Sequence, residues 1–230
     1  MLGFPGESAG CLGKEEVRAA SHPFQAVAAS SIVAHMIIGR KTEAYLSAAL
    51  ESIADVCDHV VVNDNSAGQG EHNAELVSRS RLARSGRVTV IHTVFKDFAS
   101  ARNACLDATP LAYSRGWALF VDADEVHGGE LAEMAALLSA LPDDVDAVDG
   151  YSRHFVGSFS WWIAMGRRLC FFRLAASRRW YGKVHERLAP LRRRVVLPAV
   201  WFHYGHVVTP TAEAEKSRLY ASLDTSKVSP

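Results

Sequence analysis

The residues best suited to chemistry follow one apolar segment. Residues 117–121 form an unbroken apolar run, and Asp122, Asp124 and Glu125 come directly after it. Such a run predicts a strand buried on both faces of a sheet. Carboxylates crowded at its end repel one another unless a cation lies between them, and divalent metals bind oxygen ligands. Because alternate residues of an extended chain point the same way, we expect Asp122 and Asp124 to share one metal ion.

A helix start is the alternative explanation for these acids. Asp124 or Glu125 could cap the helix expected near Gly129, because acidic side chains favour the N-terminal end of a helix. Capping accounts for one or two acids, but not for three directly after a buried strand. We therefore expect a metal site at these acids rather than a helix cap alone.

Two further segments place polar groups where we expect the same sheet edge. Asp64 comes just after the strand expected over residues 58–62, where it could accept hydrogen bonds from a nucleotide base or ribose, although Asn, Asp and Ser are also common in plain turns. Arg102 lies in the first turns of a helix expected over residues 98–108. Its guanidinium could clamp phosphate oxygens, or it could be an ordinary surface arginine.

Glu186 is the single carboxylate in a basic segment and follows Trp180. An aromatic ring beside a carboxylate suits a stacked sugar and a hydroxyl that loses its proton. The alternative is a strand in which Trp180 belongs to the core and Glu186 pairs with Arg187 or Arg179.

Two late histidines, His203 and His206, follow a long apolar stretch. A single histidine is more often a structural hydrogen-bonding group than a ligand. Beside an aspartate-rich metal site, however, an imidazole is a natural extra ligand, and it would shift the preference from Mg²⁺ toward Mn²⁺.

The order of the expected elements is typical of an α/β fold. Strands alternate with helices through residue 141, which predicts a parallel sheet with right-handed crossovers and ligands at the carboxyl ends of its strands. After Pro142, further strands should extend the sheet and form a small antiparallel lobe. The expected strands are 31–38, 58–62, 87–94, 117–121, 145–155, 168–174, 184–188 and 195–204, and the expected helices are 42–54, 71–80, 98–108, 130–141 and 211–223.

Composition predicts one globular domain. A length of 230 residues with 49% hydrophobic content is enough for a full core. We expect this domain over residues 30–230 and a loosely ordered tail over residues 1–29, which lack periodicity.

Charge and cysteine content narrow the protein class. The formal net charge is zero, so no overall field draws the chain to nucleic acid. Four widely spaced cysteines without a CxxC pair argue against a zinc site and a disulfide framework, and they suit a reducing compartment. No signal peptide or membrane span is expected, so the predicted location is cytoplasmic, with contact to a membrane surface left open.

The charges are unevenly distributed along the chain. Residues 122–149 hold nine acids and no Lys or Arg, whereas residues 151–194 hold eleven Lys or Arg and one acid. Two solvated faces of opposite sign would explain this, and so would a metal-binding edge beside a pocket for a diphosphate.

Taken together, these segments resemble the family 2 glycosyltransferases of the GT-A fold over residues 31–206. The stretch 122–125 (DADE) resembles the family's DxD motif, and Arg102-Asn103 resembles an Arg-Asn pair. Residues 180–186 are similar to its W…HE segment, and His203 is similar to a late histidine that completes the metal shell. The resemblance implies a single Rossmann-like domain with a mostly parallel central sheet, helices on both faces and a small antiparallel C-terminal lobe.

The same resemblance implies a donor and a metal. The donor would be a UDP-, GDP- or dTDP-sugar, with Mn²⁺ or Mg²⁺ held by Asp124 and His203. Asp122 would lie between metal and ribose, and Asp64 would contact the base. Arg102 and Asn103 would contact the donor, and we also expect Arg40 to contact it.

Transfer would proceed with inversion to a small molecule, a glycan or a lipid-linked sugar. Glu186 is our candidate for the base that deprotonates the acceptor, and Glu125 is its rival. The loops after the first two strands depart from the family pattern, at residues 39–43 and 66–70, which leaves the base identity open. The alternatives are a sugar-phosphate nucleotidyltransferase and a non-catalytic nucleotide-sugar-binding protein.

Overall fold

The computed structural model describes residues 30–224, except the side chains of residues 164 and 165. The predicted tail, residues 1–29, lies outside this range. In order along the chain, the elements are β1 (Ile32–Ile38), α1 (Leu46–Ile53), β2 (His59–Asp64), α2 (Glu71–Arg79), α3 (Arg81–Arg84), β3 (Val88–His92), α4 (Phe98–Asp107), η1 (Leu111–Tyr113), β4 (Trp117–Phe120), β5 (Glu125–His127), α5 (Glu130–Leu137), η2 (Leu138–Ala140), β6 (Val145–Val156), β7 (Trp162–Arg173), β8 (Arg179–Tyr181), β9 (Arg187–Ala189), β10 (Arg193–His206) and α6 (Pro210–Leu223).

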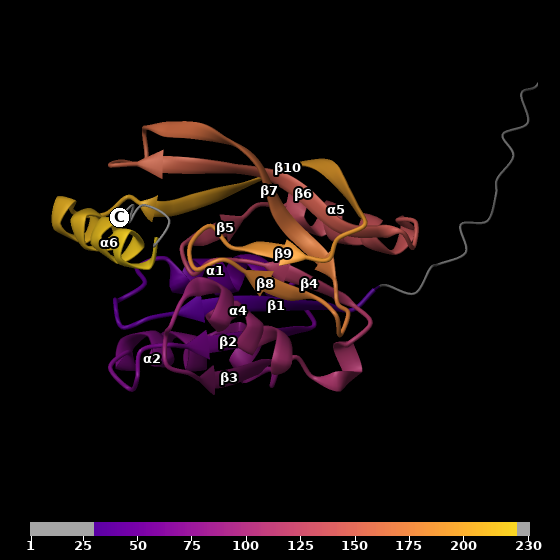
Figure 1. Ribbon diagram of the computed structural model, residues 1–230, viewed down its shortest axis with the longest axis horizontal. Helices are drawn as coiled ribbons and strands as arrows, with labels where there is room; N and C mark the ends of the chain where they lie inside the picture. Colours follow the sequence, from indigo (N-terminus) through magenta and orange to yellow (C-terminus); the bar gives the residue numbers. More distant parts are fainter. Residues whose placement is uncertain (1–29, 225–230) are drawn as a thin grey trace, which may run out of the picture.

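One eight-stranded sheet runs through the molecule in the order β3-β2-β1-β4-β7-β6-β10-β5 (Figure 1). The strands β3, β2, β1 and β4 are mutually parallel, so their carboxyl ends lie on one side. Beyond β4 the directions are mixed, because β7 is antiparallel to both β4 and β6, and β5 is antiparallel to β10. A separate two-stranded antiparallel sheet pairs β8 with β9. This arrangement confirms the predicted α/β class with a mostly parallel sheet and a small antiparallel lobe.

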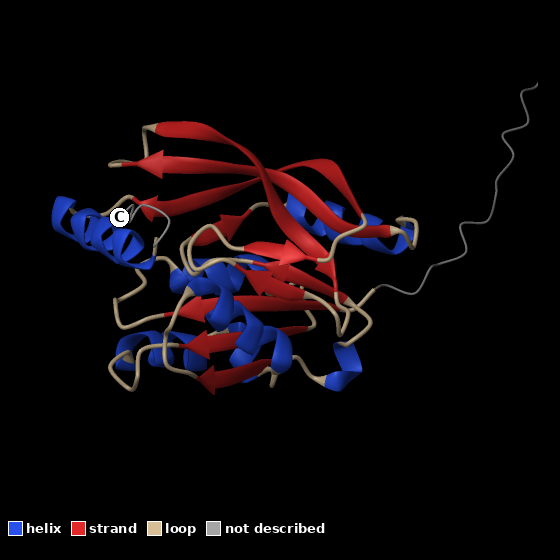
Figure 2. Cartoon of the chain, in the orientation of Figure 1, coloured by secondary structure: helices blue, strands red, loops and turns tan. Residues whose placement is uncertain are grey.

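The strands of the parallel half are apolar on both sides, because helices cover both faces of the sheet (Figure 2). Alternate residues of β4 show the two layers: Trp117 and Leu119 pack into the larger core cluster, whereas Ala118 and Phe120 pack into a second one. The helix α4 contacts β1, β2 and β8 on one face, while α1, α2 and α5 lie over the other. This alternation of buried residues fixes the register of β4. Asp122, the first polar residue after the strand, therefore lies at the sheet edge.

Several predicted boundaries need correction. The strand expected over residues 184–188 forms only from Arg187, as β9, because the chain between β8 and β9 is a turn in which Gly182 and His185 have positive φ. Glu125 starts the short strand β5 and does not cap α5, whose N-cap is Gly129. The first helix begins only at Leu46, and β7 begins at Trp162, earlier than expected.

The acidic and basic segments largely neutralise each other. Asp146 lies between Arg178 and Arg192, and Asp149 pairs with Arg194 at 2.5 Å. These pairs join β6 to the start of β10 and to the loop before β8. The two segments are therefore neither simply two solvated faces of opposite sign nor wholly a metal-binding edge beside a diphosphate pocket. Among residues 30–224, no helix combines the length and apolar character that a membrane span needs.

Candidate active site

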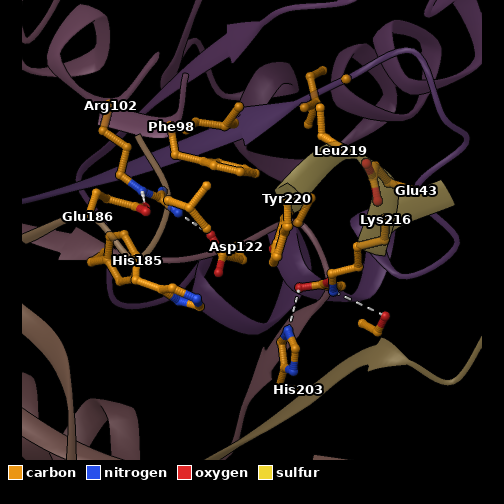
Figure 3. Close-up of a pocket in the computed structure, with 18 of the residues that line it drawn as sticks. Glu43, Phe98, Arg102, Asp122, His185, Glu186, His203, Lys216, Leu219 and Tyr220 are labelled. Atoms are coloured by element: carbon orange, nitrogen blue, oxygen red, sulfur yellow. Dashed lines mark hydrogen bonds and ion pairs between the residues drawn. The ribbon is translucent and has the colours of Figure 1, made fainter. Parts of the chain in front are cut away.

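A cavity of about 1490 Å³ opens at the carboxyl ends of β1 and β4. Its wall combines the loop after β1, the start of α4, the segment after β4, the end of β10 and one face of α6 (Figure 3). Parallel strands bring residues from distant parts of the chain to this edge. The predicted residues that line it are Arg40, Arg102, Asp122, Asp124, Glu186 and His203.

Asp122 is held between two arginines. Its Oδ1 accepts a hydrogen bond from Arg102 Nη2 at 2.5 Å, and its Oδ2 accepts one from Arg168 Nη2 at 2.5 Å. Burial opposes ionisation of Asp122, but the two guanidinium groups outweigh it and hold its pKa well below the usual range. Both carboxylate oxygens are therefore already engaged by cations of the chain itself.

Glu125 lies in the interior, with no exposed surface. Its Oε1 accepts a hydrogen bond from Trp201 Nε1 at 2.9 Å and another from Arg168, and its Oε2 accepts one from the backbone N–H of Asp122 at 2.9 Å. Burial raises the pKa of Glu125. Glu125 does not line the cavity, so the structure contradicts its predicted acceptor contact and assigns it to the support of Arg168 and Asp122.

Asp124 and His203 face each other across a narrow gap. Asp124 Oδ1 lies 3.3 Å from His203 Nε2, and this buried oxygen accepts no well-formed hydrogen bond from residues 30–224. Gly205 closes the gap from below, since a Cβ there would lie 2.3 Å from Asp124 Oδ2 and 2.8 Å from His203 Nε2. Although burial opposes protonation of His203, its pKa is raised because Asp124 favours the imidazolium.

Two atoms bound side by side to an octahedral Mg²⁺ or Mn²⁺ lie about 3 Å apart, at bond lengths of about 2.1 Å. The spacing of Asp124 Oδ1 and His203 Nε2 fits such an ion, and the glycine leaves room for it. Asp122 fits less well, because an ion would have to displace Arg102 or Arg168 from its oxygens.

Arg102 projects from α4 and is almost fully buried. Its Nε donates to Glu186 Oε1 at 2.6 Å, and its guanidinium stacks 3.9 Å from the Phe120 ring centroid. Asn103, the next residue, turns away from the cavity: its amide bonds the backbone N–H and C=O of Trp180. The structure thus brings Arg102 to Glu186, and it gives Asn103 the task of holding β8 against α4.

Trp180 belongs to the core, although it also lines the cavity. It is 5% exposed and packs against Phe120 and Phe172 at centroid distances of 5.0 and 5.9 Å. The alternative explanation was right about this tryptophan. It was wrong about Glu186, which pairs with Arg102 instead of Arg179 or Arg187.

Asp64, at the end of β2, lies beside the large cavity rather than in its wall. It lines a smaller cavity of about 320 Å³ together with His92. Its Oδ1 accepts a hydrogen bond from the backbone N–H of Ser66 at 2.8 Å, and its Oδ2 lies 3.3 Å from His92 Nδ1. Ile38 lines both cavities, so the two adjoin at the end of β1.

The structure adds wall residues that the sequence reasoning missed. Glu43 faces the cavity, and burial together with the nearby Asp124 raises its pKa to about 7. Lys216 and Tyr220 come from α6, and the Tyr220 ring meets Phe98 edge-on at 5.6 Å. The helical spacing of the cavity-facing residues of α6 was a usable signal (Ala212, Glu215, Lys216, Leu219, Tyr220). Nothing local marked Glu43.

Comparison with solved structures shows a shared fold. The crystal structure of S. aureus TarS 1-349 matches with a TM-score of 0.51 and 16% identity, over 84% of this chain and 64% of that one. The crystal structure of a mycobacterial protein matches with a TM-score of 0.39 and 19% identity, over 58% of this chain and 44% of that one. The chain thus spans under two thirds of the length of these structures.

Sequence comparison gives the family. No curated protein matches the chain. The model of glycosyl transferase family 2 matches residues 36–198, which is more than half of the sequence. With the parallel sheet and the cavity at its carboxyl edge, this match shows that the chain has the GT-A fold and belongs to glycosyl transferase family 2.

Proposed function

We propose that this glycosyltransferase moves a sugar from a nucleotide-diphospho-sugar to its acceptor in one displacement with inversion, assisted by Mn²⁺ or Mg²⁺. The observation that carries the proposal is the facing pair Asp124 Oδ1 and His203 Nε2, 3.3 Å apart above Gly205. An ion bound there would neutralise charge on the departing diphosphate. The predicted preference for Mn²⁺ rests on the imidazole ligand.

We assign Asp122 to positioning rather than to metal binding. It holds Arg102 and Arg168 at the cavity edge, where each guanidinium is fixed by a second carboxylate as well, Glu186 for Arg102 and Glu125 for Arg168. Guanidinium groups that are already held in position need not reorganise when negative charge develops on a leaving group.

The diphosphate would lie among the cationic groups of the wall. Among the described residues, the buried Nη1 of Arg102 has no hydrogen-bond partner. Lys216 donates a long hydrogen bond of 3.4 Å to the carbonyl of Gly205, and Arg40 is exposed at the cavity mouth. Phosphate oxygens can accept hydrogen bonds from the N–H groups of these side chains.

Glu186 remains our candidate for the base. It lines the cavity, and Arg102 fixes its orientation through Oε1. We expect Glu186→Gln to lower turnover by about 10²–10⁴-fold without changing nucleoside diphosphate binding. Glu43→Gln serves as a matched carboxylate variant of the same cavity. Full turnover in Glu186→Gln, with loss in Glu43→Gln, would transfer the role to Glu43.

The donor class can be read from binding and product analysis. We propose that Asp64 and the adjoining end of β1 bind the nucleobase, because the smaller cavity adjoins the main one there. Thermal shifts with UDP, GDP and dTDP, with and without Mn²⁺, should single out one base. Release of free sugar together with the nucleoside diphosphate would support transfer, whereas binding without release would favour a non-catalytic binding protein.

The acceptor is proposed to be lipid-linked and presented at a membrane surface. The turn between β6 and β7 exposes Phe159 and Trp161, at 63% and 76%, and Arg153 stacks 4.1 Å from the ring centroid of Trp162 at the hairpin. Aromatic rings beside cations are typical of protein segments at the lipid interface. Trp161→Ser should reduce co-sedimentation with anionic vesicles, whereas Leu111→Ser, an exposed control outside this hairpin, should not.

A further inference from the structure

Three histidines meet in the cavity wall next to Asp124. His154 comes from β6, and His203 and His206 come from the end of β10, which runs parallel to it. One ring nitrogen of each can be chosen so that all three lie within 4.8 Å of one another. His154 and His203 are buried, whereas 35% of the His206 side chain is exposed. The cluster is thus enclosed by protein on most sides and reachable from the cavity.

In each of the three rings, one nitrogen lies near an oxygen of a neighbouring side chain. Ser152 Oγ lies 2.8 Å from His154 Nε2, Asp124 Oδ1 lies 3.3 Å from His203 Nε2, and Glu213 Oε1 lies 3.2 Å from His206 Nδ1. Histidines that bind metals usually donate their outer N–H to such an oxygen, which fixes the tautomer and the ring orientation. The nitrogens that remain for a shared ligand are Nδ1 of His154, Nδ1 of His203 and Nε2 of His206.

The inner nitrogens already compete for one proton. His154 Nδ1 and His203 Nδ1 lie 2.8 Å apart in a hydrogen bond, so one carries a proton and the other a lone pair. Two nitrogens on a tetrahedral zinc lie about 3.4 Å apart, with Zn–N bonds of about 2.0–2.1 Å. Zinc binding would require these two nitrogens to move from 2.8 Å to about 3.4 Å apart. The ion would take the place of the shared proton, which leaves to solvent from a ring pair that carries three protons and moves to the unprotonated outer nitrogen of a neutral pair.

From this arrangement we propose that His154, His203 and His206 bind a zinc-class ion at a site separate from the Asp124–His203 gap. Imidazole nitrogens suit Zn²⁺ and Co²⁺ better than Mg²⁺. Three histidines with the fourth position open to a cavity form a recognised type of zinc coordination.

One consequence rests on the proposed function. His203 offers Nε2 to the ion at Asp124 and Nδ1 to the three-histidine site. When zinc occupies Nδ1, the neutral ring keeps its proton on Nε2 and donates it to Asp124. Zinc therefore excludes Mn²⁺ from the gap, and it joins β6, β10 and, through Glu213, the helix α6.

The test is direct metal binding to the full chain after removal of metals with a chelator. Co²⁺ absorption bands and Zn²⁺ competition should report one tetrahedral site in the wild type. We expect His206→Ala and His154→Ala to weaken Zn²⁺ binding at least 10-fold, and Glu213→Gln to weaken it about 10-fold. His72→Ala, an exposed histidine of α2, should bind as the wild type does. Unchanged affinity in both His206→Ala and His154→Ala would overturn the proposal.

Asp124→Asn separates this site from the proposed catalytic ion. An asparagine oxygen can accept a hydrogen bond from His203 Nε2 when zinc is bound at Nδ1, so zinc binding should persist while Mn²⁺ binding is lost. If Asp124→Asn instead abolished zinc binding and His154→Ala kept it, the ion would lie in the gap and the three-histidine site would be wrong. If Asp124→Asn left Mn²⁺ binding intact while His154→Ala lost zinc, the catalytic ion site would be wrong and the present proposal would stand.

Discussion

Gly205→Ala tests the metal gap with a single methyl group. The added Cβ would lie 2.3 Å from Asp124 Oδ2, 2.8 Å from His203 Nε2 and 2.9 Å from His203 Cε1. Because Cβ contacts below 3.0 Å essentially do not occur, the Asp124 carboxylate must retreat by at least 0.7 Å. The methyl occupies the space between the two proposed ligands, so it acts on the gap without changing the charge of either.

The expected size of the effect follows from this displacement. Misplacing a catalytic group by about 1 Å costs on the order of 10²-fold in rate, or about 2.7 kcal/mol in the barrier. We expect a similar loss in Mn²⁺ affinity, because one ligand moves and the other is obstructed. The fold should tolerate the change, since Gly205 lies within β10 and alanine is favoured over glycine in a strand by about 0.5–1 kcal/mol.

The assay is Mn²⁺ binding by electron paramagnetic resonance, followed by metal-dependent turnover of the donor. Gly166→Ala is the matched control: this glycine also lies in a strand that lines the cavity, and its Cβ would meet nothing within 4 Å. Wild-type Mn²⁺ affinity in Gly205→Ala, with a normal unfolding temperature, would refute the assignment of the ion to Asp124 and His203.

Two further predictions concern buried charge. Because the pKa of Glu43 is raised to about 7 in the folded chain, ionisation is disfavoured there, and stability falls as pH rises from about 4.5 to 7. Glu43→Gln should therefore raise the free energy of unfolding at pH 8 in EDTA by at most about 3 kcal/mol, seen as a higher unfolding temperature. Near pH 4.5 it should leave both nearly unchanged. Asp122→Asn leaves Arg102 and Arg168 without their shared carboxylate, and we expect about 3–5 kcal/mol lower stability in urea unfolding.

Each of these variants has a control in the chain. Asp144→Asn removes an exposed partner of Arg193 and should cost less than about 1 kcal/mol. If Asp122→Asn were no more destabilising than this surface change, the clamp between the two arginines would have no energetic role. Equal pH dependence of stability in the wild type and in Glu43→Gln would show that the Glu43 carboxylate ionises as in the unfolded chain.

Local patterns predicted most of the elements correctly. The apolar run of residues 117–121 became β4, and Phe98–Asp107 became α4 almost to the residue. Buried strands and amphipathic helices leave a periodic signal in the sequence, because each side chain reports on the face it occupies. The turn at residues 182–186 was missed because its backbone depends on positive φ at Gly182 and His185, which the apolar pattern does not encode.

The sequence alone determined which groups are available at the sheet edge. Three acids after a buried strand, and an arginine at the start of a helix, had to gather there once the parallel order was set. It did not determine how the acids divide their tasks. Asp122, Asp124 and Glu125 are neighbours, yet one is clamped by arginines, one faces a gap and one is buried against Trp201.

Only the tertiary structure decided these roles, because they depend on partners far away in the chain. Arg168, Trp201 and His203 reach the three acids through β7 and β10, strands whose pairing closes long loops. The same holds for α6, which lines the cavity about a hundred residues after the acids. Electrostatic roles arise from distances of a few ångströms between such segments, and no local sequence pattern contains those distances.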